Sequence, residues 1–417
     1  MKIPSHHATT AHLGAIFPFF SENHTLANRV VIGSNLFGGT FCFDPFEIYA
    51  NGVISNPNMV VFGQIGMGKS SFVKTYILRQ SIFGRKAWII DPKGEYSQLA
   101  LALNCRPIVL RPNGSIKLNP LELGTSDLLV ALVESGMKRG LRPIERAGLD
   151  IALSIAKAKA KDANLDYATL PNVLDELLDP SESFSKSLFI DQKDLKGEIK
   201  EIALELLRMV SGDLRGMFDG PTSKGITPKA RCVVIDLSNL YSSHSLSAVM
   251  ACATSWLQSE MIEREPDGGL FMVIDEAWAV LEDIGVSKWL QKSFKLARSY
   301  GVSNIAVMHR FSDLLSGGEL GSLQEKLGEG LLKDSETKVI FAQPTSEIDS
   351  AKNAFGLSET EAALIHQLTR ARSLWKVGNR SYLVDNFLTG YEARLVNTDA
   401  AMHSSSLIAN AFSVTPG

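Results

Sequence analysis

The 417-residue chain has few cysteines, no long apolar run and no excess of positive charge. Its four cysteines are far apart and form no C-x-x-C pair, so we expect reduced thiols rather than disulfides or a metal site. They are Cys42, Cys105, Cys232 and Cys252. No apolar stretch reaches the roughly 18 to 20 residues of a membrane span, and the N-terminus lacks a signal pattern. We therefore expect no intrinsic membrane span and a cytoplasmic protein, with peripheral attachment to the inner face of the cell membrane as an alternative.

The charge balance does not indicate a nucleic-acid-binding protein. The net charge is -3, from 42 Lys and Arg against 45 Asp and Glu. Contacts to phosphates need clustered cations, and the chain has no global excess of them. One local basic group consists of Lys138, Arg139, Arg142 and Arg146. We interpret it as a solvated helix face, with a DNA or partner site as the alternative.

Short apolar runs alternate with segments of helical periodicity along most of the chain. The runs are residues 59–62, 87–90, 108–110, 232–236, 270–275, 304–308 and 338–341. Fully apolar strands between helices imply a parallel sheet covered on both faces, so the sequence predicts an α/β fold with a mainly parallel central sheet. Residues 374–384 predict a hairpin at the edge of this sheet, turning at Gly378-Asn379-Arg380.

Residues 63–70 match the P-loop pattern G-x-x-x-x-G-K-[ST] and lie between a predicted strand and a predicted helix. In such loops the glycine-rich backbone surrounds phosphates, Lys69 would bridge the β- and γ-phosphates, and Ser70 would bind Mg²⁺. A chance glycine-rich turn is the alternative. The predicted ATP-binding residues are Gly63, Gln64, Ile65, Gly66, Met67, Gly68, Lys69, Ser70 and Ser71.

A P-loop needs an acidic strand end that holds magnesium and orients the attacking water. The run ending in Asp275-Glu276 supplies it, with Asp275 in the magnesium role and Glu276 as the general base. A solvated acidic pair at the start of the next helix is the alternative. Asp236 also ends an apolar strand, but no second carboxylate follows it. We therefore predict an ATPase that uses Asp275 and Glu276.

Several longer segments accompany these motifs. They are Asp275-Glu276-Ala277-Trp278, Ile90-Asp91-Pro92-Lys93-Gly94-Glu95-Tyr96, Leu118-Asn119-Pro120-Leu121 and Met217-Phe218-Asp219-Gly220-Pro221-Thr222. In the type, order and spacing of these segments, the chain resembles the conjugative type IV secretion ATPases, the fourth VirB component, within the HerA/FtsK superfamily. The resemblance covers roughly residues 50–390. The stretch from Gly33 to Pro57 is similar to truncated relatives of actinobacterial mobile elements.

The resemblance implies a RecA-like motor domain with an all-helical subdomain, assembling into homo-hexamers that power conjugation or secretion together with membrane channel components. Longer family members carry a large N-terminal domain that docks on the channel. This chain begins too close to its P-loop to include one, so we expect that domain to be missing or supplied by a separate chain.

Two residues carry less certain roles within the resemblance. The superfamily's Gln after the next strand is replaced by His309, which senses the γ-phosphate or only caps its strand. Arg298 matches a segment that supplies an arginine finger in trans. The alternative is a surface arginine on a helix with Lys288, Lys292 and Lys295. If Arg298 is not the finger, the next candidates are Arg310, Arg370 and Arg372, acting within the chain.

The sequence predicts five parts. They are a β-rich lead-in at 1–55, the first part of the ATPase domain at 56–124, a helical insertion at 125–212 with a polar loop at 181–196, the second part of the ATPase domain at 213–395, and a loose tail at 396–417.

Three functions fit this organisation. The favoured one is a hexameric ATPase that powers conjugation or type IV secretion. The second is a double-stranded DNA translocase of the HerA/FtsK kind, for which DNA would be a partner. A nucleotide-binding scaffold without hydrolysis is the third, and Glu276 argues against it.

Overall fold

The computed structural model describes residues 29–396, except for residues 37–38, 123–125, 225, 227–229, 242, 244, 263–267, 282–283 and 312–322. Most of the predicted N-terminal lead-in and nearly all of the predicted C-terminal tail therefore lie outside the described residues. None of the described helices is long and apolar enough to cross a membrane.

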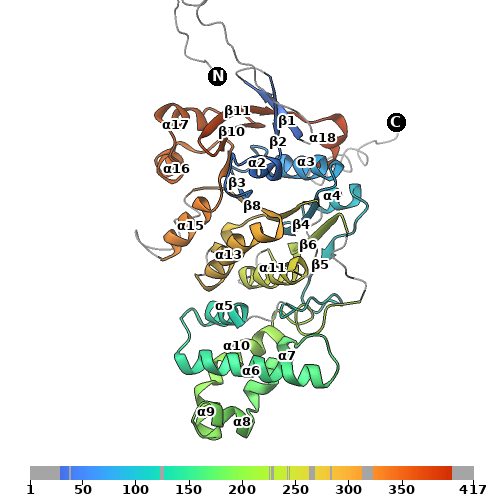
Figure 1. Cartoon of the computed structure of the whole chain (residues 1–417), viewed down its shortest axis with the longest axis vertical. Helices are drawn as coiled ribbons and strands as arrows, with labels where there is room; N and C mark the ends of the chain where they lie inside the picture. Colours follow the sequence, from blue (N-terminus) through green and yellow to red (C-terminus); the bar gives the residue numbers. More distant parts are fainter. Residues whose placement is uncertain are drawn as a thin grey trace, which may run out of the picture.

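One sheet of eleven strands organises the described part of the chain, in the order β2-β1-β11-β10-β9-β3-β8-β7-β4-β6-β5 (Figure 1). The strands are β1 (Val30–Asn35), β2 (Thr40–Phe43), β3 (Met59–Phe62), β4 (Lys86–Asp91), β5 (Ile108–Val109), β6 (Cys232–Asp236), β7 (Leu270–Ile274), β8 (Val302–Met308), β9 (Thr337–Ile340), β10 (Arg372–Val377) and β11 (Arg380–Asn386).

The seven strands from β9 to β5 in this order run parallel, and the other four are antiparallel to their neighbours. The predicted α/β fold with a mainly parallel sheet is confirmed. The predicted hairpin exists as β10 and β11, but its expected position at the sheet edge is wrong. β11 pairs with β1 and β1 with β2, because the lead-in strands extend the sheet beyond the hairpin.

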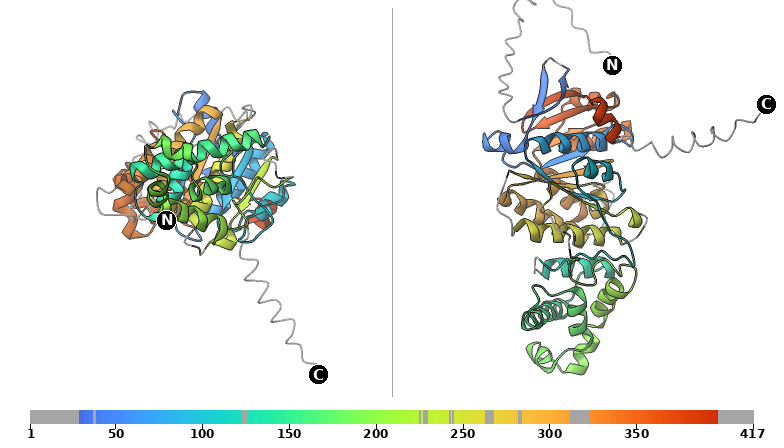
Figure 2. Two further views of the ribbon diagram at one scale, coloured as in Figure 1. Left: turned by 90° about the horizontal axis from the view of Figure 1, so that it is seen from below. Right: turned by 90° about the vertical axis from the view of Figure 1, so that its right-hand side faces the viewer.

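Both faces of the sheet are buried, as the continuous apolar runs require. Alternate residues of β3 enter two different clusters: Val60 and Phe62 join the core on the α11 and α13 side, whereas Met59 and Val61 join the core under α3 and α4. Figure 2 shows these helices on opposite faces of the sheet.

The helices of this sheet domain follow the strands. They are α2 (Pro45–Ala50), α3 (Lys69–Ile82), α4 (Ser97–Ala102), η1 (Ser238–Leu240), α11 (Leu246–Ile262), α12 (Trp278–Leu281), α13 (Ile284–Ala297), η2 (Arg298–Tyr300), α15 (Leu323–Lys333), η3 (Thr345–Glu347), α16 (Ile348–Phe355), α17 (Glu359–Ile365) and α18 (Gly390–Val396).

A bundle of helices lies at the far end of the molecule, beyond α11 and α13 (Figure 1). It contains α5 (Ser126–Met137), α6 (Pro143–Asp162), α7 (Leu170–Leu178), α8 (Glu182–Ser187), α9 (Gln192–Glu198) and α10 (Lys200–Ser211). Helix α5 joins the two regions, because it packs on α13 and α11 and also on α6 and α10. The all-helical insertion is thus present, while the predicted domain boundaries stay predictions.

The expected loop at residues 181–196 is wrong, because α8 and most of α9 lie there. The hydroxyl of Ser181 accepts a hydrogen bond from the N–H of Phe184 and so caps α8. The side chains of Phe184 and Leu195 are fully buried and attach the two short helices to the bundle core. The two apolar residues that anchor this polar stretch are too few to give a clear helical periodicity, so the sequence does not predict these helices.

Candidate active site

The loop of residues 63–70 joins the end of β3 to the start of α3, at the edge where the parallel strands end. Gly68 caps α3 with φ of 109°, a conformation that glycine adopts readily and other residues rarely do. A side chain at Gly63 would collide with Phe341, because its Cβ would lie 2.5 Å from the Cβ of Phe341. No side chain caps α3, so its first N–H groups can meet an anion.

The Lys69 side chain is buried and folds back along this loop. Its Nζ donates to the carbonyl oxygens of Gly63 at 2.5 Å and Gln64 at 3.1 Å, and it lies 3.0 Å from Nδ1 of His309. Burial lowers the pKa of Lys69 to about 8, while the negative charges of Asp275 and Glu276 act in the opposite direction. The ammonium group is therefore poorly solvated and available to a phosphate.

The acidic pair lies directly after β7, where Asp275 and Glu276 are 3% and 2% exposed. Glu276 has φ of 52°, in the left-handed region that residues with a Cβ seldom occupy. Its N–H donates to Oδ1 of Asp275 at 2.9 Å. Backbone conformations of this kind cost of order 1–3 kcal/mol and concentrate at functional sites.

The Glu276 carboxylate is bound on both oxygens. Oε1 lies 2.5 Å from Nζ of Lys93 and 2.8 Å from Nε2 of His309, and Oε2 accepts from Nε1 of Trp278. Burial alone would raise the pKa of Glu276, but the hydrogen bonds from His309 and Lys93 outweigh it and lower the pKa to about 2. Glu276 is therefore an ionised carboxylate at neutral pH.

Asp275 has the opposite shift. Burial raises its pKa to about 7, and the negative charges of Glu276 and Asp91 add to the effect. Asp91 ends β4 and accepts hydrogen bonds from the N–H groups of Glu95 and Tyr96 at 3.1 and 2.8 Å. Three carboxylates thus lie near one another at the ends of β4 and β7, an arrangement that an added cation would stabilise.

Asp236, the competing acidic strand end, lies farther from the loop in the sheet. It ends β6, which is four strands from β3, whereas β7 is two strands away. Its Oδ1 accepts from the N–H of Ser238 at 2.9 Å at the start of η1. This geometry favours Asp275 over Asp236 as the partner of the loop.

A cavity of about 250 Å³ lies in front of the loop, and its wall is mainly cationic. The charged side chains on it are Lys69, Lys74, Lys93, Arg370 and Glu95, together with the ring of His309. Glu95 accepts from Lys74 at 3.4 Å, which leaves several cations to face an anion. The cavity has the charge that a polyphosphate requires.

A second cavity of about 360 Å³ adjoins the first, since Gly68, Ser71 and Arg370 line both. Its wall is mixed and includes the rings of Phe341 and Phe387. Arg79 closes it by joining α3 to α18.

The Arg79 guanidinium binds both oxygens of Glu392 at 2.6 and 2.7 Å. Arg79 also donates to the backbone carbonyls of Val31 and Phe387 at 2.6 and 2.8 Å. The C-terminal strand and helix are thereby fixed beside the loop.

The predicted arginines differ in position. Arg298 begins η2 at the end of α13, but its side chain lies outside the described residues. Arg372 forms an ion pair with Asp385 at 3.0 Å, and Arg310 lines neither cavity. Of the described alternatives, Arg370 therefore has the position that a nucleotide contact requires.

The structure thus brings Lys69, Glu276 and His309 together through direct contacts, with Asp275 beside Glu276. Ser70 and Ser71 line the phosphate-sized cavity together with Ile65, Gly66 and Gly68. Sequence reasoning assigned no role to Lys93. It follows the end of β4 by two residues, and the rule that parallel strands end at one edge would have found it.

The comparisons with known proteins agree with this architecture. Residues 45–250 match the family model described as "Helicase HerA, central domain". The chain contains a HerA/FtsK-superfamily domain. The matched segment includes the loop of residues 63–70 and the helical bundle, and it ends before Asp275. No curated protein matches the chain significantly.

Solved structures share the fold of this chain. VirB4 of Thermoanaerobacter pseudethanolicus aligns with a TM-score of 0.72 at 21% identity, covering 87% of this chain and 98% of that one. The bacterial conjugative coupling protein TrwBdeltaN70 aligns with a TM-score of 0.56 at 14% identity, covering 80% and 85%. Plasmid coupling protein TrwB with ADP and Mg²⁺ gives 0.55 at 15% identity, covering 80% and 86%.

Proposed function

We infer that this chain binds Mg-ATP at the loop of residues 63–70 and hydrolyses it. The observation that carries the proposal is the meeting of three features at one edge of the sheet. They are a glycine-rich loop with a buried lysine, a buried acidic pair, and a cavity lined by cationic side chains. The likeness of the chain's fold to TrwB, whose structures include an ATP analogue and ADP with Mg²⁺, supports the nucleotide.

The residues present fit a magnesium ion. Hard oxygen ligands suit Mg²⁺, and Ser70 and Asp275 supply a hydroxyl and a carboxylate. The described residues contain no group of three or more His, Cys, Asp or Glu that could hold a metal ion. A metal held partly by phosphate oxygens and water needs no such group. When bound, magnesium would neutralise charge on the phosphates, and Asp275 would be held ionised by it.

Glu276 is the proposed general base, and His309 and Trp278 hold its carboxylate in place. A carboxylate with a pKa of about 2 accepts a proton weakly. Loss of one cation from its Oε1 would raise the pKa and leave a free lone pair for water. His309 contacts both Lys69 and Glu276, so it is placed to link phosphate binding to the base.

The second cavity is the proposed nucleoside site. It continues from the phosphate cavity past Gly68 and Ser71, and it offers aromatic and aliphatic surface suited to a base. Arg370, at the junction of the two cavities, is placed to contact the nucleotide between the base and the terminal phosphate.

The proposed test of ATP binding is Lys69→Ala. Loss of the cation should abolish ATP binding and hydrolysis while circular dichroism and the unfolding midpoint show a folded protein. Lys376→Ala is the control, because Lys376 forms a half-buried ion pair with Glu361 at 3.2 Å and lines neither cavity. ATP hydrolysis in Lys69→Ala at the level of Lys376→Ala would contradict the site.

The proposed biological role is a hexameric motor of a conjugation or type IV secretion apparatus, as the likeness to VirB4 and TrwB suggests. Helix α5 would transmit motion from α13 to the bundle, and Arg298 would act across a subunit interface. Specific activity that rises with protein concentration and falls in Arg298→Ala supports this assembly. Concentration-independent activity with a normal Arg298→Ala protein contradicts it.

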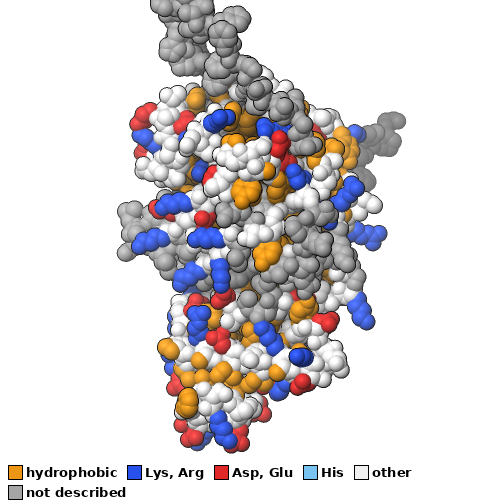
Figure 3. Space-filling model, viewed as in Figure 1, with side chains coloured by type: hydrophobic (Ala, Val, Ile, Leu, Met, Phe, Trp, Pro, Cys, Tyr) orange, Lys and Arg blue, Asp and Glu red, His pale blue; other side chains and the backbone are white. Residues whose placement is uncertain are grey.

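The alternative is a double-stranded DNA translocase. In the bundle the basic group offers little free charge, because Arg139 and Arg142 bind Glu145, Glu201 and Glu198. On the face of the bundle that Figure 3 shows, Lys and Arg side chains are interspersed with Asp and Glu rather than forming a basic stripe. Stimulation of ATP hydrolysis by double-stranded DNA would favour the translocase, and its absence the secretion motor.

A further inference from the structure

The Lys93 side chain occupies an unusual place between the acidic pair and the phosphate cavity. It is 25% exposed and lines the cavity with Lys69, while its Nζ lies 2.5 Å from Oε1 of the buried Glu276. Nζ also lies 3.3 Å from Nε2 of His309 and 5.6 Å from the ring centre of Tyr241. One ammonium group thus contacts the proposed base, Glu276, and also lines the cavity proposed for the phosphates.

We propose that Lys93 is a ligand of the γ-phosphate, supplied within the chain. Without nucleotide, Lys93 pairs with Glu276; when a nucleoside triphosphate binds, its γ-phosphate replaces Glu276 as the partner of Lys93. This inference rests on the proposed ATP site and deepens it. It adds a second cation at the terminal phosphate beside Lys69, and it makes the release of Glu276 depend on the γ-phosphate.

The surroundings of Glu276 permit such an exchange. His309 and Trp278 bind the carboxylate independently of Lys93, so the carboxylate stays in position when Lys93 leaves. Lys93 lies on the connection between β4 and α4, next to Gly94 with φ of 72°, and its ammonium group ends a flexible stem. A terminal phosphate carries more charge than one carboxylate and competes for the ammonium group.

The ion pair of Lys376 lacks these properties. Lys376 binds Glu361 at 3.2 Å, also donates to the carbonyl of Gly356, and lines neither of the two cavities. Lys376 is therefore the matched control for the loss of a partly buried lysine that bridges two elements.

The test compares the affinities of Lys93→Met for a non-hydrolysable ATP analogue and for ADP, both with Mg²⁺, by isothermal titration calorimetry. Loss of a charge-assisted contact should weaken the ATP analogue about 10- to 100-fold. ADP affinity should change little, because ADP lacks the phosphate that Lys93 would contact. Lys376→Met should bind both nucleotides as the unaltered protein does.

A second measurement tests the exchange itself. In Glu276→Gln the competing carboxylate is neutral, so affinity for the ATP analogue should rise several-fold when Lys93 is present. The gain should be clearly smaller in the double variant Lys93→Met, Glu276→Gln. An equal gain in both backgrounds would show that Glu276 and the γ-phosphate do not compete for Lys93.

The results separate this inference from the proposed function. If the unaltered protein binds neither nucleotide, the ATP site itself is wrong. If it binds both and Lys93→Met weakens them equally, or neither, Lys93 is only a structural partner of Glu276 and the inference is overturned. Selective loss of the ATP analogue, with Lys376→Met unchanged, supports it.

Discussion

Two buried glutamates in this protein, one at the sheet edge and one in the helical bundle, are each held by two basic side chains. Glu276 is bound by Lys93 and His309, and the pKa of its carboxyl group is lowered to about 2. Glu145 is bound by Arg139 and Arg142, and their hydrogen bonds, with that of Arg139 the largest, lower its pKa to about 2 as well. Charge pairing alone would not distinguish these sites.

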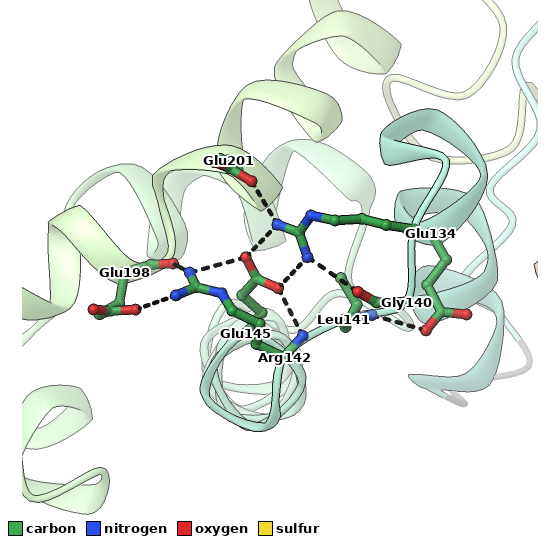
Figure 4. A network of polar contacts seen from close by, with 8 residues as sticks. Glu134, Gly140, Leu141, Arg142, Glu145, Glu198 and Glu201 are labelled. Carbon is green, nitrogen blue, oxygen red and sulfur yellow. Dashed lines mark hydrogen bonds and ion pairs between the residues drawn. The ribbon is translucent and has the colours of Figure 1, made fainter.

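The difference lies in what else the cations touch. Figure 4 shows that each arginine of the bundle network also binds a further carboxylate: Arg142 binds Glu198, and Glu201 binds the second arginine of the network. Glu145 also accepts from the N–H of Arg142 at 2.8 Å, which fixes the start of α6. The network lines neither of the two cavities beside residues 63–70, and it joins the start of α6 to α9 and α10.

The partners of Glu276 face a cavity instead. Lys93 and His309 both line it, and Glu276 itself has a strained backbone with φ of 52°. A ligand in this cavity can therefore compete for the partners of Glu276, whereas the arginines that bind Glu145 do not line it. Whether a ligand can compete for the partner of a carboxylate, rather than the strength of the ion pair, separates a functional carboxylate from a structural one.

The largest effect is expected for Glu276→Gln. It removes the proposed base while keeping the side chain's shape, so turnover should fall roughly 10²- to 10⁴-fold as for other lost general bases. ATP binding should persist, because Lys69, Ser70 and Asp275 remain. Steady-state ATPase assays and nucleotide titration measure the two quantities separately.

Glu145→Gln is the control for this variant, because it removes an equally buried, equally paired carboxylate far from the cavity. Its turnover per folded molecule should match that of the unaltered protein. Equal losses of binding and turnover in Glu276→Gln would assign Glu276 to magnesium binding, or move the base to Asp236.

For the free energy of unfolding the order should be reversed, with a larger effect of Glu145→Gln than of Glu276→Gln. Glu145→Gln leaves Arg139 and Arg142 without their shared partner, and the free energy of unfolding should fall by about 1–3 kcal/mol. Urea unfolding measures this loss. Glu182→Gln, which removes an exposed pair with Lys186 in the same bundle, should cost less than about 1 kcal/mol. Similar losses in both variants would mean that burial of Glu145 adds nothing.

The sequence predicted the features that depend on local pattern. Apolar runs identified the parallel strands, and the loop and the acidic pair at 275–276 followed from residue type and position. It misplaced the hairpin of residues 372–386, because strand neighbours from the lead-in are set by tertiary pairing and not by periodicity. Lys93 was visible in a motif, but its contact with Glu276 depends on β4 and β7 lying side by side.

The smallest effect concerns acid. Glu145 binds a proton less tightly in the folded chain, where its pKa is about 2, than in the unfolded chain, where 4.5 is the ordinary value. Its ion pairs therefore stabilise the fold fully above pH 4.5 and progressively less as pH falls toward 2. The difference in unfolding free energy between the unaltered protein and Glu145→Gln should accordingly shrink below pH 4.5.

Urea unfolding of both proteins at pH 7, 5, 4 and 3 measures this difference, and acid effects at other carboxylates cancel because both proteins share them. Glu182→Gln should show a small difference that varies little with pH, since its carboxylate is 77% exposed. A difference for Glu145→Gln that stays constant from pH 7 to pH 3 would contradict an ionised Glu145. The network would then act through shape and hydrogen bonding alone, and its likeness to the charged site at Glu276 would be limited to geometry.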